Sequence, residues 1–271
     1  MPEQDDLRAD VVGRLRQAGC VFAEEEAELL LAAADSPARL EAQLALRVSG
    51  QPLEHVLGWA EFYGLRIAIS SGVFVPRRRT ELLVAEAVAV AGQTAAPIVV
   101  DLCCGAGAVA AAIVSAIPTA RVFASDLSPE AVSCARRNLV GGGVEVFLGD
   151  LYDPLPAELY RRVDVLVANA PYVPTEAIAL MPPEARLYER RMALDGGDDG
   201  LEIARRILFS AQAWLAEGGT LLIETSDRQA EPLARAFTES GLKARIVESA
   251  ELDATVVIGA LPPDLTGDRL A

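Results

Sequence analysis

Basic residues are scarce in this chain of 271 residues, which carries 24 Lys and Arg against 39 Asp and Glu and has a net charge of −15. Proteins that coat nucleic acid without sequence preference draw most of their affinity from basic side chains that neutralise phosphates. The charge balance therefore argues against such a role. Histidine occurs once, at His55, and the four cysteines show no C-x-x-C spacing, which predicts reduced thiols and no metal site.

Long apolar runs are also missing. The most apolar stretch, residues 82–100, is interrupted by Glu86, Gln93 and Pro97, so it lacks the roughly 20 uninterrupted apolar residues of a membrane-spanning helix. The first residues are acidic, whereas a secretory signal begins with positive charge. Because 52% of the residues are hydrophobic, a packed core is expected, and we predict a globular cytoplasmic protein that does not associate with membranes.

Apolar residues recur at helical spacing in three stretches up to residue 57. The third stretch begins at Ser36-Pro37, a helix N-cap followed by proline at the first helical position, and ends at Gly50. We expect residues 1–57 to form a small helical domain.

Residues 58–79 change from helical to extended patterning. Two short extended segments, 61–69 and 73–75, flank Ser70-Ser71-Gly72, which are typical turn residues. This stretch predicts a β-hairpin with its turn at residues 70–72, which links the helical domain to the rest of the chain.

From residue 80 to residue 271, predicted strands and helices alternate, which is the pattern of a parallel sheet with helices on both faces. Strands are expected at 98–102, 121–125, 144–148, 163–168, 220–224, 244–247 and 255–258, and helices at 80–91, 108–117, 129–138, 201–216 and 229–240. The chain is therefore assigned to the α/β class, with a seven-stranded Rossmann-like domain after the small helical domain.

Three predicted strands end in residues suited to a nucleotide-like ligand. The first runs into the segment 101–107, a glycine turn at a helix N-terminus, where the backbone can approach a ligand. The second ends at Asp126, whose carboxylate can accept both hydroxyls of a ribose. The third leads to Asp150 and Leu151, which can hold an adenine amine and its ring face. Each has a simpler alternative: a tight turn without ligand, a helix cap at Asp126 or Ser128, and an exposed acid at a strand end.

The fourth strand, 163–168, ends in Asn169-Ala170-Pro171-Tyr172. With the glycine loop earlier in the sheet, this run resembles the Asn-Pro-Pro-Tyr motif of S-adenosylmethionine-dependent methyltransferases that act on planar nitrogens. The segments 51–58, 61–65, 73–81 and 188–201 make the chain similar to the HemK/PrmC family of protein glutamine methyltransferases. The resemblance covers nearly the whole chain, including the helical part.

The resemblance implies a class I methyltransferase domain at 80–271, S-adenosylmethionine as cofactor, and substrate recognition by residues 1–57. It implies that Asn169 and the backbone carbonyl of Ala170 accept the N–H bonds of the target amide, while Pro171 and Tyr172 complete the catalytic motif. The implied cofactor-binding residues are Asp101, Cys103, Gly105, Gly107, Asp126, Leu127, Asp150, Leu151 and Asn169, and the implied substrate-binding residues are Phe74, Asn169 and Tyr172.

The same resemblance implies a protein partner, peptide chain release factor, methylated at the glutamine of its Gly-Gly-Gln motif, and no sequence-specific binding of nucleic acid. Three departures from the family pattern fall near the substrate side: Ala170 replaces the first proline of the motif, Arg190 replaces the proline after Glu189, and Arg78 replaces the second proline of a Pro-Arg-Pro run. They indicate a diverged paralogue. Two alternatives stay open, a methyltransferase for the adenine amine of nucleic acid and a paralogue that binds S-adenosylmethionine without turnover.

Overall fold

The computed structural model describes residues 2–141 and 143–263. Residues 1, 142 and 264–271, which the predicted domains include, lie outside the described part. Within it the chain opens with helices and a hairpin: α1 (Pro2–Gln17), α2 (Ala23–Ala33), α3 (Pro37–Val48), α4 (Leu53–Leu57), β1 (Trp59–Phe62) and β2 (Leu65–Ala68). Among the described residues, no helix is both long and apolar enough to cross a membrane.

The elements that follow alternate between strand and helix. In chain order they are η1 (Arg78–Thr80), α5 (Glu81–Ala91), β3 (Ile98–Leu102), α6 (Ala108–Ala116), β4 (Arg121–Asp126), α7 (Pro129–Asn138), β5 (Val144–Leu148), η2 (Ala157–Leu159), β6 (Val163–Ala168), η3 (Thr175–Leu180), α8 (Pro183–Tyr188), η4 (Arg191–Ala193), α9 (Glu202–Trp214), β7 (Leu215–Thr225), α10 (Asp227–Glu239), β8 (Lys243–Ser249) and β9 (Ala254–Ala260). This confirms the predicted α/β class.

In the described part of the chain the main sheet has seven strands in the order β5-β4-β3-β6-β7-β9-β8. The first five strands in this order are parallel to one another, as predicted. At the end of the chain the sheet departs from the parallel pattern, because β9 is antiparallel to both β7 and β8. Only residues 250–253 connect β8 to β9, and so short a connection has no helix to carry the chain across, which leaves an antiparallel hairpin as the available pairing.

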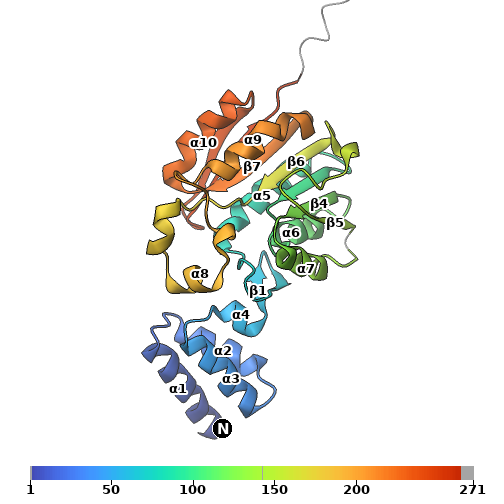
Figure 1. Ribbon diagram of the computed structural model, residues 1–271. Coiled ribbons are helices and arrows are strands. Elements are labelled where there is room, and N and C mark those ends of the chain that lie inside the picture. Colours follow the sequence, from blue (N-terminus) through green and yellow to red (C-terminus); the bar gives the residue numbers. More distant parts are fainter. Residues whose placement is uncertain (1, 142, 264–271) are drawn as a thin grey trace, which may run out of the picture.

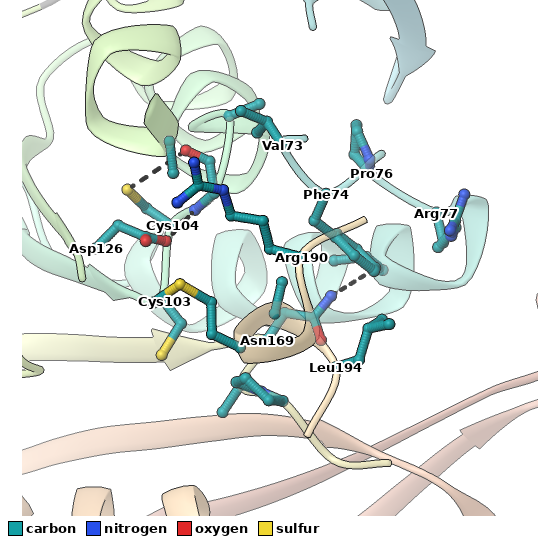
Figure 2. A pocket seen from close by; sticks show the side chains of 18 of the residues that line it. Val73, Phe74, Pro76, Arg77, Cys103, Cys104, Asp126, Asn169, Arg190 and Leu194 are labelled. Carbon is teal, nitrogen blue, oxygen red and sulfur yellow. Dashed lines mark hydrogen bonds between the residues drawn. The ribbon is translucent and has the colours of Figure 1, made fainter. Parts of the chain in front are cut away.

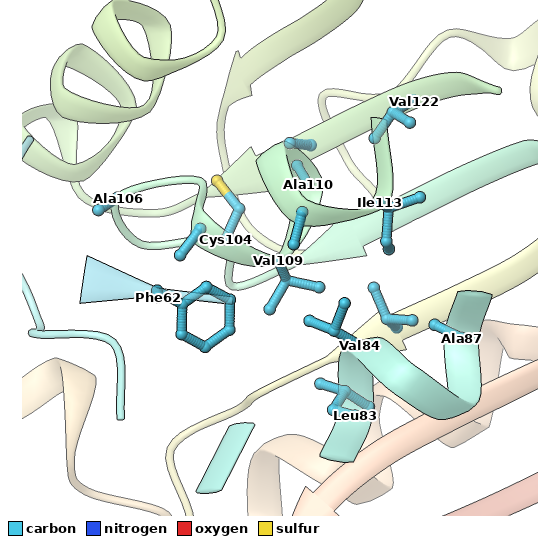
Figure 3. Close-up of a cluster of buried hydrophobic side chains, with 14 of the residues drawn as sticks. Phe62, Leu83, Val84, Ala87, Cys104, Ala106, Val109, Ala110, Ile113 and Val122 are labelled. Carbon is cyan, nitrogen blue, oxygen red and sulfur yellow. The ribbon is translucent and has the colours of Figure 1, made fainter. Parts of the chain in front are cut away.

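Helices cover both faces of the sheet (Figure 1). Helices α5, α6 and α7 pack on one face around residues such as Val84, Ile113 and Val122, shown in Figure 3, and α9 and α10 pack on the other face around Ile207 and Phe237. Successive residues of the central strands point into opposite clusters. Because both faces are buried, these strands read in the sequence as continuous apolar runs rather than alternating ones.

The hairpin lies earlier than predicted. Strands β1 and β2 pair antiparallel with Phe62 opposite Leu65, so the turn is Tyr63-Gly64 and not residues 70–72. Both turn residues have positive φ, 51° and 71°, which matches the right-handed twist of a two-residue hairpin loop. At Gly72 the chain instead forms an isolated parallel bridge to Glu189. The segment after it thereby lies along the loop that follows α8.

The helices before the hairpin have a hydrophobic cluster of their own, built around Leu15, Leu30 and Leu44. Ser36 caps α3 by accepting a hydrogen bond from the backbone N–H of Arg39 at 3.3 Å, as predicted. One buried side chain connects this cluster to the rest of the molecule. Arg47 of α3 pairs with Glu26 of α2 at 2.6 Å and with Glu184 of α8 at 2.6 Å, so the helical module lies against the region that follows β6 (Figure 1).

Candidate active site

A cavity of about 660 Å³ opens at the carboxyl ends of β3, β4 and β6. The chain runs from β3 outward to β5 and then returns to place β6 on the other side of β3, and this reversal in strand order is where open α/β sheets bind ligands. Nearly all the predicted site residues line this one cavity: Phe74, Asp101, Cys103, Gly105, Asp126, Leu127, Asp150, Leu151, Asn169, Ala170, Pro171 and Tyr172. In Figure 2, Asp126 and Cys103 lie toward one end, Phe74 and Arg77 toward the other, and Asn169 between them.

Gly107 is the predicted site residue that the structure does not bring to the cavity. Both Gly105 and Gly107 have positive φ, +54° and +78°. A Cβ atom at Gly105 would meet no heavy atom within 4 Å, whereas one at Gly107 would lie 2.9 Å from Cδ1 of Leu139. Gly105 therefore provides open backbone beside the cavity, and Gly107 lets the start of α6 pack closely against the end of α7.

The two glycines are therefore expected to respond differently to alanine. Gly107→Ala should lower the free energy of unfolding by about 3 kcal/mol, because the left-handed backbone costs about 1–2 kcal/mol and the overpacking about 1–3 kcal/mol. Gly105→Ala is the matched control and should cost only the backbone part, about 1–2 kcal/mol. Urea unfolding of both variants measures this, and equal losses would contradict the packing role of Gly107.

Two carboxylates hold the backbone of the glycine loop and of the helix α6 that follows it. Asp101 is 1% exposed and accepts the backbone N–H of Ala110 at 3.1 Å, and burial raises its pKa to about 8. Asp126 accepts the backbone N–H of Gly105 through Oδ2 and that of Ser128 through Oδ1, both at 2.8 Å. Burial also raises the pKa of Asp126. The backbone N–H of Leu127 also interacts with this carboxylate, which lines the cavity and can accept a further donor such as a hydroxyl.

The capping alternative for this segment is also fulfilled, by a different residue. Ser128 accepts the backbone N–H of Ala131 at 3.2 Å and so caps α7, while Asp126 remains on the cavity wall. The cap by Ser128 is confirmed, and it leaves the carboxylate of Asp126 available for the predicted ribose contact.

Asp150 has a partner that the sequence did not reveal. Its carboxylate pairs with the guanidinium of Arg206 from α9 at 2.6 Å, and Arg206 itself lines the cavity. The neighbouring Leu151 has φ +47°, and its carbonyl accepts the hydroxyl of Ser125 at 2.7 Å. Because a non-glycine residue rarely adopts positive φ, this hydrogen bond helps to hold Leu151 in place at the cavity wall.

Asn169 directly follows β6, and the NH₂ group of its side chain faces Thr80. Its Nδ2 donates to Oγ1 of Thr80 at 3.1 Å, and its carbonyl oxygen accepts no hydrogen bond from the residues that the structure describes. Ala170 is 3% exposed. The carbonyl of Tyr172 accepts Nε2 of Gln229 at 2.9 Å, and burial raises the pKa of the Tyr172 phenol. The motif is thus held from both ends, and one amide oxygen remains available beside the cavity.

The far wall of the cavity depends on an ion pair between the buried Glu189 and the partly exposed Arg77. Glu189, which follows α8, accepts Nη2 of Arg77 at 2.6 Å and the backbone N–H of Val75 at 3.1 Å. The Arg77 guanidinium lies 5.0 Å from the ring centroid of Phe74, within the range of a cation–π contact. Glu189 and Arg77 therefore fix the segment that carries Phe74, a role that sequence reasoning missed.

Arg190 crosses from the loop after α8 to the helix that follows the Asp126 segment. Its Nη2 atom lies 2.6 Å from Oε1 of Glu130 on α7, and Arg190 lines the cavity. Figure 2 shows its side chain extending toward Asp126 and Cys104. The departure from proline at this position thus gives the chain an ion pair beside the cavity.

Comparison with known proteins gives three kinds of match. Residues 65–182 match the family model described as the methyltransferase small domain. The release factor glutamine methyltransferase of Geobacter sulfurreducens is 39% identical over 200 residues, which cover 73% of this chain and 69% of that protein. The 4-amino-L-phenylalanine/4-methylamino-L-phenylalanine methyltransferase of Streptomyces pristinaespiralis is 36% identical over 243 residues, 88% of this chain and 82% of that protein. A solved methyltransferase structure from Pyrococcus furiosus shares the fold, with a TM-score of 0.53 and 15% identity over 83% of this chain and 97% of that one.

Proposed function

This chain belongs to the release factor glutamine methyltransferase family, and we propose that it transfers a methyl group from S-adenosylmethionine to the side-chain amide nitrogen of a glutamine in a peptide chain release factor. The target is the glutamine of the Gly-Gly-Gln motif, and the proposal includes a cytoplasmic location. The observation that carries it is the amide of Asn169, which keeps its carbonyl oxygen free beside the cavity while its NH₂ group is bound to Thr80.

One end of the cavity fits S-adenosylmethionine. The open side of Gly105 leaves room for the methionine part, the carboxylate of Asp126 offers an acceptor to the ribose, and Leu151 offers an apolar face for the adenine. Asp101, Cys103 and Leu127 complete this wall, and Asp150 with Arg206 stands beside Leu151. When bound, S-adenosylmethionine supplies an electrophilic methyl group on a positively charged sulfur.

The amide nitrogen of glutamine is a poor nucleophile because its lone pair is delocalised into the carbonyl. Oδ1 of Asn169 and the backbone carbonyl of Ala170 can each accept a hydrogen bond from one N–H group of this amide. This arrangement favours a nitrogen whose lone pair is directed out of the amide plane. Positioning thus does the work that a strong base would otherwise do. Tyr172 and Phe74 provide aromatic faces for the planar amide, and the proton leaves to water after the transfer.

The helical module is the part of the chain that we propose recognises the protein substrate. Arg47 joins it to Glu184, and Glu184 and Ala185 of α8 line the cavity. A protein segment that enters the cavity between α8 and the Phe74 segment therefore passes close to the junction with residues 1–57.

A second candidate substrate is the aromatic amine of a free amino acid, which is what the name of the Streptomyces pristinaespiralis relative states for that protein. The nitrogen of an aniline, like that of an amide, is planar and conjugated, so the same Asn169 geometry can hold it. Ala170 lies in the motif that would hold the acceptor nitrogen, whereas Arg190 reaches toward the Asp126 end of the cavity, where it pairs with Glu130. The adenine amine of nucleic acid belongs to the same chemical class.

The test is transfer of a labelled methyl group from S-adenosylmethionine to purified release factor, to release factor with the Gly-Gly-Gln glutamine replaced, to 4-aminophenylalanine and to adenine-containing DNA. We expect label on intact release factor and none on the variant. Label on 4-aminophenylalanine or DNA instead would assign the enzyme to that acceptor. Cofactor binding without label on any sample would identify a paralogue without turnover on these substrates.

A further inference from the structure

Two buried polar side chains, Thr80 and Glu224, adjoin Asn169 on the side away from the proposed acceptor. Thr80 ends η1 and Glu224 lies near the end of β7, and each is 2% exposed. The Thr80 hydroxyl accepts a hydrogen bond from Nδ2 of Asn169 at 3.1 Å, and it is near enough to the carboxyl group of Glu224 to stabilise its charged form. Oε2 of Glu224 has no hydrogen-bond partner among the described residues. Burying polar groups this deeply costs free energy unless they are hydrogen-bonded. An unpartnered buried oxygen such as Oε2 of Glu224 therefore suggests a functional role.

The chemistry of these groups decides which of them donates and which accepts each hydrogen bond. A hydroxyl has one proton to donate, and a carboxylate can only accept. Thr80 therefore donates to Glu224, which leaves its oxygen to accept from Asn169, so the NH₂ group of Asn169 and not its carbonyl must face Thr80. Burial raises the pKa of Glu224 to about 7, while Thr80 and Arg79 favour the charged form. A proton on the unpartnered Oε2 would still leave Oε1 as an acceptor, so the direction persists in both states.

We propose that Thr80 and Glu224 are positioning residues that set the orientation of the Asn169 amide and so present its carbonyl oxygen to the acceptor nitrogen. The proposal rests on the proposed function, since the acceptor is the planar nitrogen described above. Asn169 alone could turn its amide over, because its oxygen and nitrogen ends have the same shape. The Glu224–Thr80 pair removes that freedom in advance, which lowers the cost of reaching the reactive arrangement.

The first test reads the orientation of Asn169 without any turnover. The chain contains only two asparagines, Asn138 and Asn169, so protein labelled with ¹⁵N in asparagine side chains gives two NH₂ signal pairs. Thr80→Val keeps the shape of threonine and removes the hydroxyl. We expect it to shift the Asn169 pair at pH 8 and to leave the Asn138 pair in place, since Asn138 bonds to backbone carbonyls of Ala68 and Ala106. An unchanged Asn169 pair would overturn the proposal.

The second test reads turnover. Thr80→Val should lower kcat for methyl transfer about 10²-fold at an unchanged cofactor Kd, as expected when a reacting group loses its alignment, and Thr80→Ser, which keeps the hydroxyl, should restore most of the activity. Glu224→Leu should behave as Thr80→Val does. The control is Thr255→Val, because Thr255 is also buried, 1% exposed, and donates to a carboxylate, Asp227, at 2.6 Å, yet it does not line the cavity. It should keep full activity.

The two proposals fail in different ways. Wild-type turnover in Thr80→Val would overturn the positioning role and leave the proposed function intact. Absence of label on release factor in the wild type would overturn the proposed function, and the NMR signals of Asn169 would still decide the positioning role.

Discussion

Replacing Asn169 by alanine is expected to lower kcat for methyl transfer by about 10²–10³-fold, the loss typical when one preorganised group at a reacting centre is removed. The reason is that Oδ1 of Asn169 is the side-chain acceptor for the target N–H, whereas the Ala170 carbonyl alone cannot orient both N–H bonds. Cofactor affinity should stay within a few-fold of wild type. Single-turnover transfer of labelled methyl, with calorimetry of cofactor binding on the same samples, measures both quantities.

The pattern of the two results decides the role of Asn169. Full turnover in Asn169→Ala would rule out its role in holding the amide. A parallel loss of cofactor affinity would instead assign Asn169 chiefly to the cofactor, the second role that the family resemblance implies for it.

Replacing Asp126 by alanine is expected to raise the Kd for S-adenosylmethionine by about 10- to 100-fold, since a hydrogen bond to a charged group contributes about 1.5–3 kcal/mol. Two effects combine in this variant. The ribose loses its acceptor, and the backbone N–H of Gly105 loses the carboxylate oxygen that holds it at 2.8 Å, so the glycine loop is less well positioned. Calorimetric titration with the cofactor measures the change.

Asp164 provides the control for this prediction. It also accepts a backbone N–H, that of Ile98 at 2.8 Å, but where β3 begins rather than where it ends. Asp164→Ala should therefore leave the cofactor Kd unchanged. If both variants weaken binding equally, the effect of Asp126 is one of general stability and not of ribose recognition.

Sequence patterns predicted the bounds of β3, β5 and β6. Strands β3 and β6 are apolar runs that are almost entirely buried, whereas β5 is an edge strand that is only partly buried and is bordered by Gly143 and Gly149. The hairpin turn was misplaced because Ser70-Ser71-Gly72 and Tyr63-Gly64 both carry turn residues, and only pairing with a partner strand distinguishes them. Helix α9 ends two residues earlier than expected, where Leu215 already joins β7.

The site was predictable where its residues follow one another along the chain. Asp126, Asp150 and Asn169 were predicted at the cavity because each lies within two residues of the end of a recognisable strand. The side chains that orient them could not be found in this way. Thr80 is 89 residues from Asn169, Arg206 is 56 from Asp150, and Arg77 is 112 from Glu189, and no local pattern relates partners at such separations. Hydrogen-bond partners at these distances are set by the packing of helices on the sheet.

The strand order has a consequence for how the chain is made. Strand β9 is the last strand of the described residues but lies between β7 and β8 in the sheet. During synthesis, the edge of β7 from Thr220 to Thr225 therefore stays unpaired until residues 254–260 have emerged, although β3, β4 and β6 with the cavity residues are already complete. An open edge of this kind can pair with other chains. A chain truncated before residue 254 would therefore keep its cavity-lining segments but expose an edge of β7 that can aggregate, so pairing with β9 protects this fold.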